Sequence, residues 1–290
     1  MSKESVFKRY YSLTKPGVLY GNALTAASGF LLASRGDINL WLFVSALMGT
    51  TLVIASACVI NNYLDQDIDK LMARTKKRAL VEGSVKGSNA VIFGTSLGVI
   101  GILILYIYTN LLVVGIGIIG FVDYVVLYGM LSKRLSYHGT LVGSVSGAAP
   151  ILAGYVAAAG ALDAGAVIVF AVLFLWQMPE FYSIAVYRRN EYRAANIPVI
   201  TVVKGIEHTK KQIIAYTIAF VAATLALPAF GYAGYSYWVV MTLLGAYWLN
   251  HGIKGLKATD NNAWARKMFK ISLIILLVFS VMISIDAWIP

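Results

Sequence analysis

Long apolar runs separated by short polar stretches fill most of the chain. A membrane-spanning helix needs about 20 mostly apolar residues, and nine stretches approach or exceed that length. They are 16–34, 40–62, 89–109, 111–131, 140–160, 164–186, 212–231, 234–253 and 268–288. The pattern predicts an all-α integral membrane protein, in which residues 1–290 form a single membrane domain of nine transmembrane helices.

The composition excludes an ordinary soluble domain. Hydrophobic residues make up 59% of the chain and charged residues 13%, with a mean hydropathy of +0.74, whereas soluble domains carry about 25% charged residues. The single cysteine, Cys58, excludes a disulfide framework and a cysteine-based metal site. The polar, basic stretch 1–15 lacks the apolar core of a signal peptide, so we expect it to be retained.

The cations are strongly sided. With nine spans the polar stretches alternate between two faces, and all but one of the 24 Lys and Arg residues, Arg35, fall on the same face. Because Lys and Arg gather on the cytoplasmic side, we expect the N-terminus and the long polar loops to be cytoplasmic. The C-terminus then lies on the opposite side of a prokaryotic cytoplasmic membrane. Most of the net charge of +11 serves topology and does not indicate a nucleic-acid partner.

Two cytoplasmic loops are longer than the others. They are 65–88 and 188–211, and they follow the second and the sixth predicted spans. This offset of four spans suggests a pseudo-repeat of spans 1–4 and 5–8, with the ninth span extra. In a duplicated protein the two loops would face each other over one central cavity, as sites at repeat interfaces often do.

The first long loop begins with a cluster of oxygen-bearing side chains. Asn61, Asp65 and Asp69 lie at i, i+4 and i+8, so they share one face of a helix, while Asp67 points elsewhere. Such a row suits Mg²⁺, which is usually bound by one or two carboxylates plus substrate phosphates. Because the chain has only 13 acidic residues, their concentration here predicts a metal site.

Cations follow directly and suggest a polyanionic ligand. Arg74, Lys77 and Arg78 are predicted to bind a diphosphate, because Arg forks onto phosphate oxygens and Lys acts as a point charge. The alternative is a solvated helix end with ordinary ion pairs, which is the usual origin of a charge run. The motif begins inside a span, where polar groups suggest function, and this favours the metal–diphosphate site.

This stretch resembles a known family. Asn61, Asp65 and Asp69, followed by Arg74-Thr75 and Arg78, are similar to the first aspartate-rich motif of the UbiA superfamily of intramembrane prenyltransferases. The resemblance implies nine helices around a central cavity, with Mg²⁺ and an isoprenoid diphosphate held by two cytoplasmic loops.

Further motifs resemble one branch of that superfamily, the heme O synthases, which are protoheme IX farnesyltransferases. They cover the chain from about residue 10 to its end. The matching segments are Thr14–Gly17, Tyr128 with Lys133-Arg134, Gly139–Gly143, Gly147–Pro150, Trp176–Phe181 and Tyr187–Pro198.

The resemblance implies roles for individual residues. It places Asn61, Asp65 and Asp69 on one Mg²⁺ and Glu191 on a second, with Asp65, Asp69 and Glu180 as catalytic residues. It adds Lys133, Arg134 and Arg188 to the diphosphate-binding cations, and it makes Gln177, Glu180, His138 and Tyr192 candidates for heme contact or the cavity wall. This chain departs from the family pattern at Glu180, where the family has His, at Glu191, where it has Asp, and at Ala79, where Pro is common.

The implied activity is transfer of a farnesyl group from farnesyl diphosphate to a vinyl group of heme b, giving heme O for terminal oxidases. The partners would be the two substrates and the bilayer. The protein would also associate with a terminal oxidase or with a downstream heme-modifying enzyme. Alternatives are a prenyltransferase acting on a quinone precursor and a non-catalytic heme-binding protein. A transporter is also conceivable on the strength of Asp123 inside a span, although the main acidic residues lie at the cytoplasmic edge rather than at the midplane.

Overall fold

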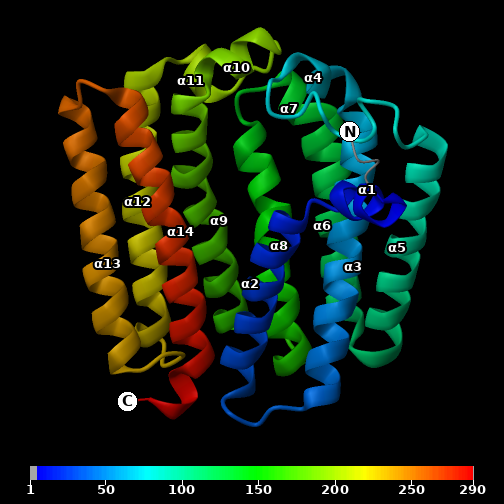
Figure 1. Ribbon diagram of the computed structural model, residues 1–290. Helices are drawn as coiled ribbons and strands as arrows, with labels where there is room; N and C mark the ends of the chain where they lie inside the picture. Colours follow the sequence, from blue (N-terminus) through cyan, green and yellow to red (C-terminus); the bar gives the residue numbers. More distant parts are fainter. Residues whose placement is uncertain (1–4, 290) are drawn as a thin grey trace.

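The computed structural model describes residues 5–289 and consists of helices and their connections, with no strand in that range. Residues 1–4 of the predicted retained N-terminus, and Pro290, lie outside the described residues. The long helices run along one common direction and form a single bundle (Figure 1). Their bounds are α2 (Pro16–Ser34), α3 (Leu40–Leu64), α5 (Gly87–Tyr108), α6 (Leu111–Val122), α8 (Gly139–Ala159), α9 (Ala164–Tyr187), α12 (Ile206–Ala229), α13 (Tyr235–Lys254) and α14 (Asn261–Ile285).

Every predicted span is a helix. Seven helices of the described chain are long and apolar enough to cross a membrane, and the two others that match predicted spans are α2 and α13. Polar residues interrupt the apolar runs of these two helices, for example Asn22 in α2 and Asn250 and His251 in α13. Both run beside the other long helices in the same bundle (Figure 1), which is consistent with the nine-helix prediction.

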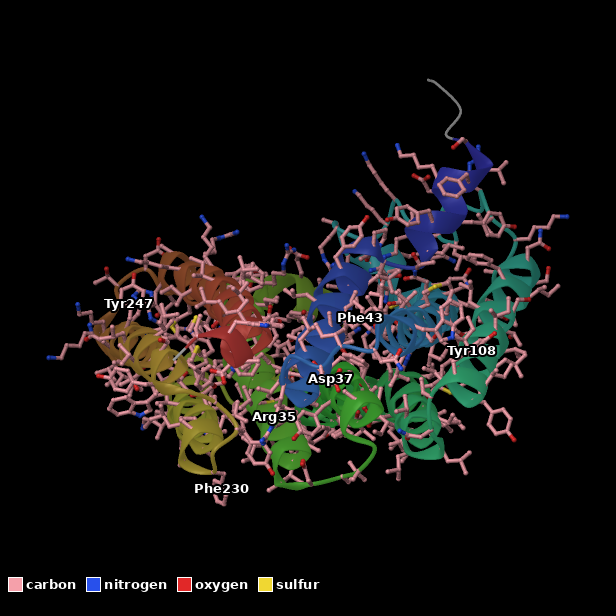
Figure 2. All side chains as sticks on the ribbon, turned by 90° about the horizontal axis from the view of Figure 1, so that it is seen from below. Arg35, Asp37, Phe43, Tyr108, Phe230 and Tyr247 are labelled. Carbon is pink, nitrogen blue, oxygen red and sulfur yellow. The ribbon has the colours of Figure 1, made fainter. Side chains whose placement is uncertain are left out.

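The ends of several spans are set by capping side chains. Asn39, Asn110 and Asp163 each precede a long helix and accept a hydrogen bond from the backbone N–H three residues ahead, which satisfies a donor that the helix leaves unpaired. Figure 2 looks onto this end of the bundle, where Arg35 and Asp37 lie in the short connection between α2 and α3. The connections at this end are short: 35–39, 109–110, 160–163 and 230–234.

The opposite end carries the longer connections and their short helices. These are α1 (Val6–Leu13), α4 (Gln66–Leu71), α7 (Lys133–Leu135), α10 (Arg189–Ala194) and α11 (Ile200–Val203), with the 3₁₀ turn η2 (Gly255–Lys257) joining α13 to α14. A second 3₁₀ turn, η3 (Asp286–Trp288), follows α14 at the C-terminal end of the bundle. Both predicted long loops thus fold as a short helix directly after a long one, α4 after α3 and α10 after α9 (Figure 1).

The fourth predicted span contains an irregular segment. After α6 the chain continues as the π-helix η1 (Asp123–Ser132) and then as α7. π-helices are rare in proteins, but those that occur often lie at functional sites. It widens the helix where Tyr124 and Tyr128 project, and the two rings stack with their centroids 5.8 Å apart.

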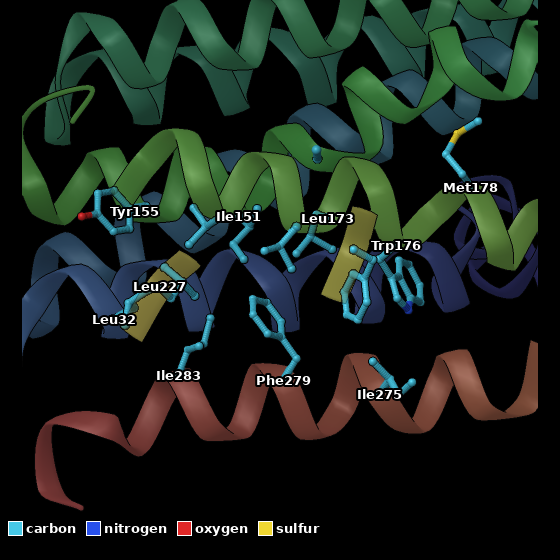
Figure 3. Close-up of a cluster of buried hydrophobic side chains, with 14 of the residues drawn as sticks. Leu32, Ile151, Tyr155, Leu173, Trp176, Met178, Leu227, Ile275, Phe279 and Ile283 are labelled. Atoms are coloured by element: carbon cyan, nitrogen blue, oxygen red, sulfur yellow. The ribbon is translucent and has the colours of Figure 1, made fainter. Parts of the chain in front are cut away.

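The helices pack through small residues and large buried side chains. A Cβ added at Gly154 of α8 would collide with the backbone carbonyl of Ala26 in α2, so this crossing requires glycine, as close helix pairs in membranes often do. Figure 3 shows the core beside it, where Ile151, Leu173 and Phe279 meet from α8, α9 and α14. Outward-facing apolar side chains remain exposed over the bundle, for example Ile107, Leu243 and Leu277, as a lipid-facing surface requires.

Candidate active site

A cavity of about 590 Å³ lies inside the bundle, between α2, α3, α6, η1, α8, α9 and α14. Its wall is charged at the end near α4; the residues there include Lys15, Asn61, Asp65, Asp69, Arg74, Arg78 and Lys133. The rest of the wall is apolar or small; it includes Val53, Ile54, Ile116, Gly117, Phe121, Pro150, Leu173 and Leu276. The size is that of a small-molecule site, and the wall matches a ligand with an anionic head and an apolar tail.

The cavity runs deep into the bundle. Asp65 follows the last residue of α3 at the charged rim, and Thr50 lines the cavity on that helix. At 1.5 Å per residue these two positions are about 22 Å apart, against about 30 Å for a hydrocarbon core. An apolar chain attached to a head group at the rim would therefore be enclosed over most of the membrane depth.

The aspartate motif keeps its helical register across a break. Helix α3 ends at Leu64 and α4 begins at Gln66. Even so, the N–H of Asp65 donates to the carbonyl of Asn61 at 2.9 Å, and the N–H of Asp69 donates to the carbonyl of Asp65 at 2.8 Å. The predicted i, i+4, i+8 row is thus preserved, and all three side chains face the cavity.

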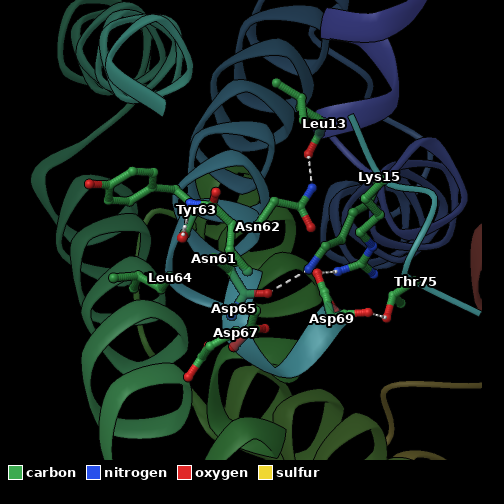
Figure 4. A network of polar contacts seen from close by, with 12 residues as sticks. Leu13, Lys15, Asn61, Asn62, Tyr63, Leu64, Asp65, Asp67, Asp69 and Thr75 are labelled. Carbon is green, nitrogen blue, oxygen red and sulfur yellow. Dashed lines mark hydrogen bonds and ion pairs between the residues drawn. The ribbon is translucent and has the colours of Figure 1, made fainter. Parts of the chain in front are cut away.

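Each of these three side chains has a cation within hydrogen-bond distance, and these cations come from three separate parts of the chain. We call these contacts the oxygen–cation pairs. They are Lys15 Nζ to Asn61 Oδ1 at 2.6 Å, Lys133 Nζ to Asp65 Oδ2 at 2.5 Å and Arg78 Nη1 to Asp69 Oδ2 at 2.5 Å. Asp65 Oδ1 also lies 3.7 Å from Arg134 Nη2. Figure 4 shows Lys15 reaching the motif beside Asp65 and Asp69. The first long loop is therefore folded back onto the cavity rim by charge.

The rim has the donor set for Mg²⁺ in combination with a phosphate ligand. Asp65 is 2% exposed, and its Oδ1 is buried without a hydrogen-bond partner among residues 5–289. No group of three or more His, Cys, Asp or Glu side chains with metal-binding geometry occurs in that range. Mg²⁺ suits such a site, because it is often held by one or two carboxylates and completes its shell with waters and substrate phosphates.

Lys15 was not among the predicted site residues, yet it lies on the cavity wall. Besides contacting Asn61 it donates to the hydroxyl of Tyr124 at 3.4 Å and lies 5.8 Å from the centre of that ring. Burial lowers the pKa of Lys15 to about 8. The only feature of the sequence that could have identified Lys15 as a site residue was its place in the Thr14–Gly17 motif. The distribution of Lys and Arg alone explains Lys15 as one of the cations that set the membrane topology.

Five predicted site residues are not on the cavity wall. Lys77 is exposed, and the ring of His138 packs at a tilt against that of Tyr137, with centroids 4.0 Å apart. Arg188 and Glu191 pair with each other at 3.0 Å, as surface ion pairs do, and Arg134 pairs with Asp67 at 2.6 Å. The bond from Arg134 lowers the pKa of Asp67 to about 2. As predicted, Asp67 points away from the motif face, and its side chain is 64% exposed.

The two long loops meet at the rim through apolar side chains. Ile68 and Met72 of the first loop form one buried cluster with Ala195 and Ile197 of the second. Tyr192 packs against this cluster and also lines the cavity, as predicted for a cavity residue. The loops therefore face each other across the site, while the duplication itself stays a prediction.

Helix α9 supplies the wall opposite the motif. Gln177 is buried and donates to the carbonyls of Ser144 and Leu173 at 3.2 and 3.0 Å, and Glu180 lies one turn nearer the rim. Glu180 is 7% exposed, and its carboxylate has no hydrogen bond or ion pair with the described residues. It is thus the one acidic group of the wall that is free of a protein partner in the part of the chain that the structure describes.

Asp123, the residue behind the transporter alternative, makes a local structural contact. Its Oδ2 accepts a hydrogen bond from the backbone N–H of Ser146 at 3.0 Å. It joins η1 to α8 and is absent from the residues that line the cavity.

Comparisons with known proteins agree on family and fold. Residues 22–274 match the UbiA prenyltransferase family. The chain is 49% identical over 281 residues to a protein from Yersinia pseudotuberculosis serotype O:1b named protoheme IX farnesyltransferase, covering 97% of this chain and 95% of the relative. A protein of the same name from Citrobacter koseri is 48% identical over 285 residues, covering 98% and 96%.

Solved structures share the fold at low sequence identity. A structure described as digeranylgeranylglyceryl phosphate synthase in membranes superposes with a TM-score of 0.81 at 18% identity, over 97% of this chain and 98% of that one. A UbiA homolog from Archaeoglobus fulgidus bound to GPP and Mg²⁺ superposes with a TM-score of 0.69 at 15% identity, over 95% and 99%.

Proposed function

The chain belongs to the UbiA prenyltransferase family, and we propose that it transfers a farnesyl group from farnesyl diphosphate to a vinyl group of heme b, giving heme O. The observation that carries this proposal is the cavity, because its charged rim and deep apolar wall match a prenyl diphosphate. The relatives that are about half identical over nearly the full chain bear the name of this activity. The setting would be a prokaryotic cytoplasmic membrane with the rim on the cytoplasmic side, as the distribution of Lys and Arg predicts.

At the rim, the residues of the motif would hold the head group. Asn61, Asp65 and Asp69 would bind Mg²⁺, which when bound neutralises charge developing on the leaving diphosphate. Arg74, Arg78 and Lys133 line the same end and would bind phosphate oxygens. Fixed donors aimed at the charge that develops lower the barrier without reorganising during the reaction. The first bond to break is that between the farnesyl C1 and the diphosphate oxygen, whose electron pair leaves with the diphosphate.

Below the rim, the wall would protect the allylic cation. The stacked rings of Tyr124 and Tyr128 offer π faces that attract a cation, and the apolar residues around them exclude water. The heme vinyl carbon then attacks the farnesyl C1 and leaves a cation next to the porphyrin ring. Water adds to that cation, and the adduct loses a proton to become the hydroxyl group of the product.

Glu180 is the residue we assign to this last proton. It lies seven residues from the end of α9 at Tyr187, which is about 10 Å below the rim at 1.5 Å per residue. Its carboxylate is buried, faces the cavity and has no hydrogen bond or ion pair with residues 5–289, so it would be positioned to accept the proton that water releases. Association with a terminal oxidase or a heme-modifying enzyme stays a prediction.

The test is direct. Purified protein is incubated with heme b, farnesyl diphosphate and Mg²⁺, and the pigments are analysed by mass spectrometry for heme O. A parallel reaction replaces heme b with an aromatic quinone precursor. Heme O formation that requires both farnesyl diphosphate and Mg²⁺ supports the proposal. Prenylation of the aromatic acceptor alone would assign the chain to the other branch, and heme binding without any prenyl transfer would assign it a non-catalytic role.

A further inference from the structure

At the rim, Mg²⁺ would compete with the three cations of the oxygen–cation pairs for the same side-chain oxygens. Every side chain that would bind Mg²⁺ already has an ammonium or guanidinium nitrogen within 2.6 Å of one oxygen. Mg²⁺ requires near-octahedral oxygen ligands at about 2.0–2.1 Å. Asn61 has only one ligating oxygen, and Lys15 donates to it. Mg²⁺ bound to that oxygen would lie close to the ammonium group of Lys15, and the repulsion between the two cations favours movement of Lys15 away from Asn61.

The charges indicate what would move them. The two carboxylates and three cations of the pairs sum to one positive charge, and Arg74 at the same end of the cavity brings the rim to two. Mg²⁺ by itself would raise this to four positive charges at close range, where like charges repel strongly. A diphosphate by itself would meet two aspartates that repel it. Bound together, metal and diphosphate satisfy all the groups, because the metal takes the protein oxygens and the phosphate oxygens take the cations.

We propose that Lys15, Lys133 and Arg78 exchange partners when Mg²⁺ and the diphosphate bind. The three cations move from Asn61, Asp65 and Asp69 to the phosphate oxygens, and Mg²⁺ binds the three side chains that they release. This inference rests on the proposed diphosphate site and adds how it fills: metal and diphosphate bind with strong positive coupling, and each binds weakly without the other. It also assigns Lys15 to the diphosphate-binding residues.

Lys15 is the most informative of the three cations. It has no carboxylate partner among residues 5–289, only the Asn61 amide and the Tyr124 hydroxyl. Lys15 is partly buried, and Asp65 acts on it only from beyond ion-pair distance. Withdrawing a cation from water without a close charged partner is costly, so an anion bound in the cavity would supply the partner that Lys15 lacks.

The backbone holds Lys15 in this place. Its φ of 54° lies in the left-handed region, which is unfavourable for a residue with a side chain. Pro16 follows and starts α2, and the Nδ2 of Asn62 donates to the carbonyl of Leu13 at 2.8 Å, which ties the segment to α3. Unfavourable backbone conformations of this kind persist where the surrounding structure fixes them, often at ligand sites.

The test is calorimetric titration of the purified chain with Mg²⁺ alone, with inorganic pyrophosphate alone, and with each in the presence of the other. We expect each ligand to strengthen the affinity for the other by tenfold or more, within the usual range of coupling between sites. In Lys15→Gln, pyrophosphate binding in the presence of Mg²⁺ should weaken about tenfold while binding of Mg²⁺ alone strengthens. A merely structural role for Lys15 would weaken both.

Lys76→Gln is the matched control. It makes the same change at an exposed position in the first long loop, away from the cavity wall, and should leave both titrations unchanged. Lys133→Gln tests the exchange at a second pair, with the same opposed changes expected, and serves if Lys15→Gln does not fold. Affinity for Mg²⁺ that is independent of pyrophosphate in the wild-type chain, or weakening of both ligands in the folded variants, would overturn the exchange.

These titrations use neither heme nor a prenyl chain. Coupled binding without heme O formation would therefore refute the proposed acceptor and keep the exchange. Heme O formation with uncoupled binding would refute the exchange and keep the activity.

Discussion

Two aspartates only two positions apart give the sharpest test of the site, because the structure separates their surroundings. Asp65 is 2% exposed, lines the cavity and pairs with Lys133, whereas the side chain of Asp67 is 64% exposed and pairs with Arg134 outside the cavity. Asp65→Asn and Asp67→Asn make the same chemical change, and each removes the charge from one short ion pair. Asp65→Asn also removes a longer contact, at 3.7 Å, with Arg134. A difference in their effects on catalysis therefore reports the role of the cavity rather than the loss of an ion pair.

The expected magnitudes follow from burial. Replacing the carboxylate of Asp65 by an amide keeps a neutral acceptor for Lys133, so the cost in stability is about 1–1.5 kcal/mol, the difference between charged and neutral hydrogen bonds. This leaves the protein folded if its stability is the usual 5–15 kcal/mol or so. Loss of an electrostatic group at a reacting centre costs about 10²–10³ in kcat. For Asp67→Asn, breaking a surface pair costs under about 1 kcal/mol and should leave kcat within about twofold of the wild type.

The assay is the initial rate of heme O formation by mass spectrometry, at saturating farnesyl diphosphate and heme b, with thermal melting of each variant as the control for folding. A normal rate in Asp65→Asn would remove the metal assignment. Equal losses in the two variants would show that the ion pairs hold the loop and that cavity position has no special role.

Two further predictions concern the opposite wall and the bundle. Glu180→His should raise the affinity for heme, measured by absorbance titration, or the rate of heme O formation, because an imidazole ligates iron and a carboxylate is a poor substitute. Glu180→Gln is the control. An unchanged heme titration and an unchanged rate in the His variant would refute the idea. Gly154→Ala should destabilise the protein by about 1–3 kcal/mol, as overpacking does, because the added Cβ meets the carbonyl of Ala26. Gly115→Ala, where the added atom meets nothing within 4 Å, should match or exceed wild-type stability by thermal melting; the reverse order would contradict the packing argument.

The helices were predictable because hydropathy reports the solvent around them. The span predicted at 16–34 coincides with α2, and 40–62 falls two residues short of α3. The errors occur where a helix continues into water. Helix α12 begins at Ile206 rather than at 212, and α14 begins at Asn261 rather than at 268, since their first turns are polar and carry no hydropathy signal. The π-helix η1 was not predicted, because its sequence is as apolar as that of an α-helical span.

The site was predictable where local spacing determines it. Asn61, Asp65 and Asp69 were selected over Asp67 by helical periodicity, and the structure preserves that selection across the break at Asp65. Lys15 and the stacked pair Tyr124 and Tyr128 depend on contacts between distant segments. Residue 15 meets residue 61 only after α2 and α3 have packed around one cavity, so no single-sequence pattern marks it.

The two long loops resemble each other in shape but differ in what they bring to the cavity. The first delivers two carboxylates and two guanidinium groups, those of Asp65, Asp69, Arg74 and Arg78, whereas the wall residues from the second are Tyr192, Ile197 and Val199. Glu191 stays outside in its pair with Arg188, within the described residues. The likeness in position therefore does not extend to chemistry: the first loop supplies the charge for a diphosphate, and the second closes the rim through the apolar cluster it shares with the first. This asymmetry suits two unlike substrates, since an anionic donor head needs charged groups while a flat, largely apolar acceptor needs covered surface. Helix α9, which leads into the second loop, carries Glu180, the one carboxylate of the cavity wall that has no hydrogen bond or ion pair within residues 5–289.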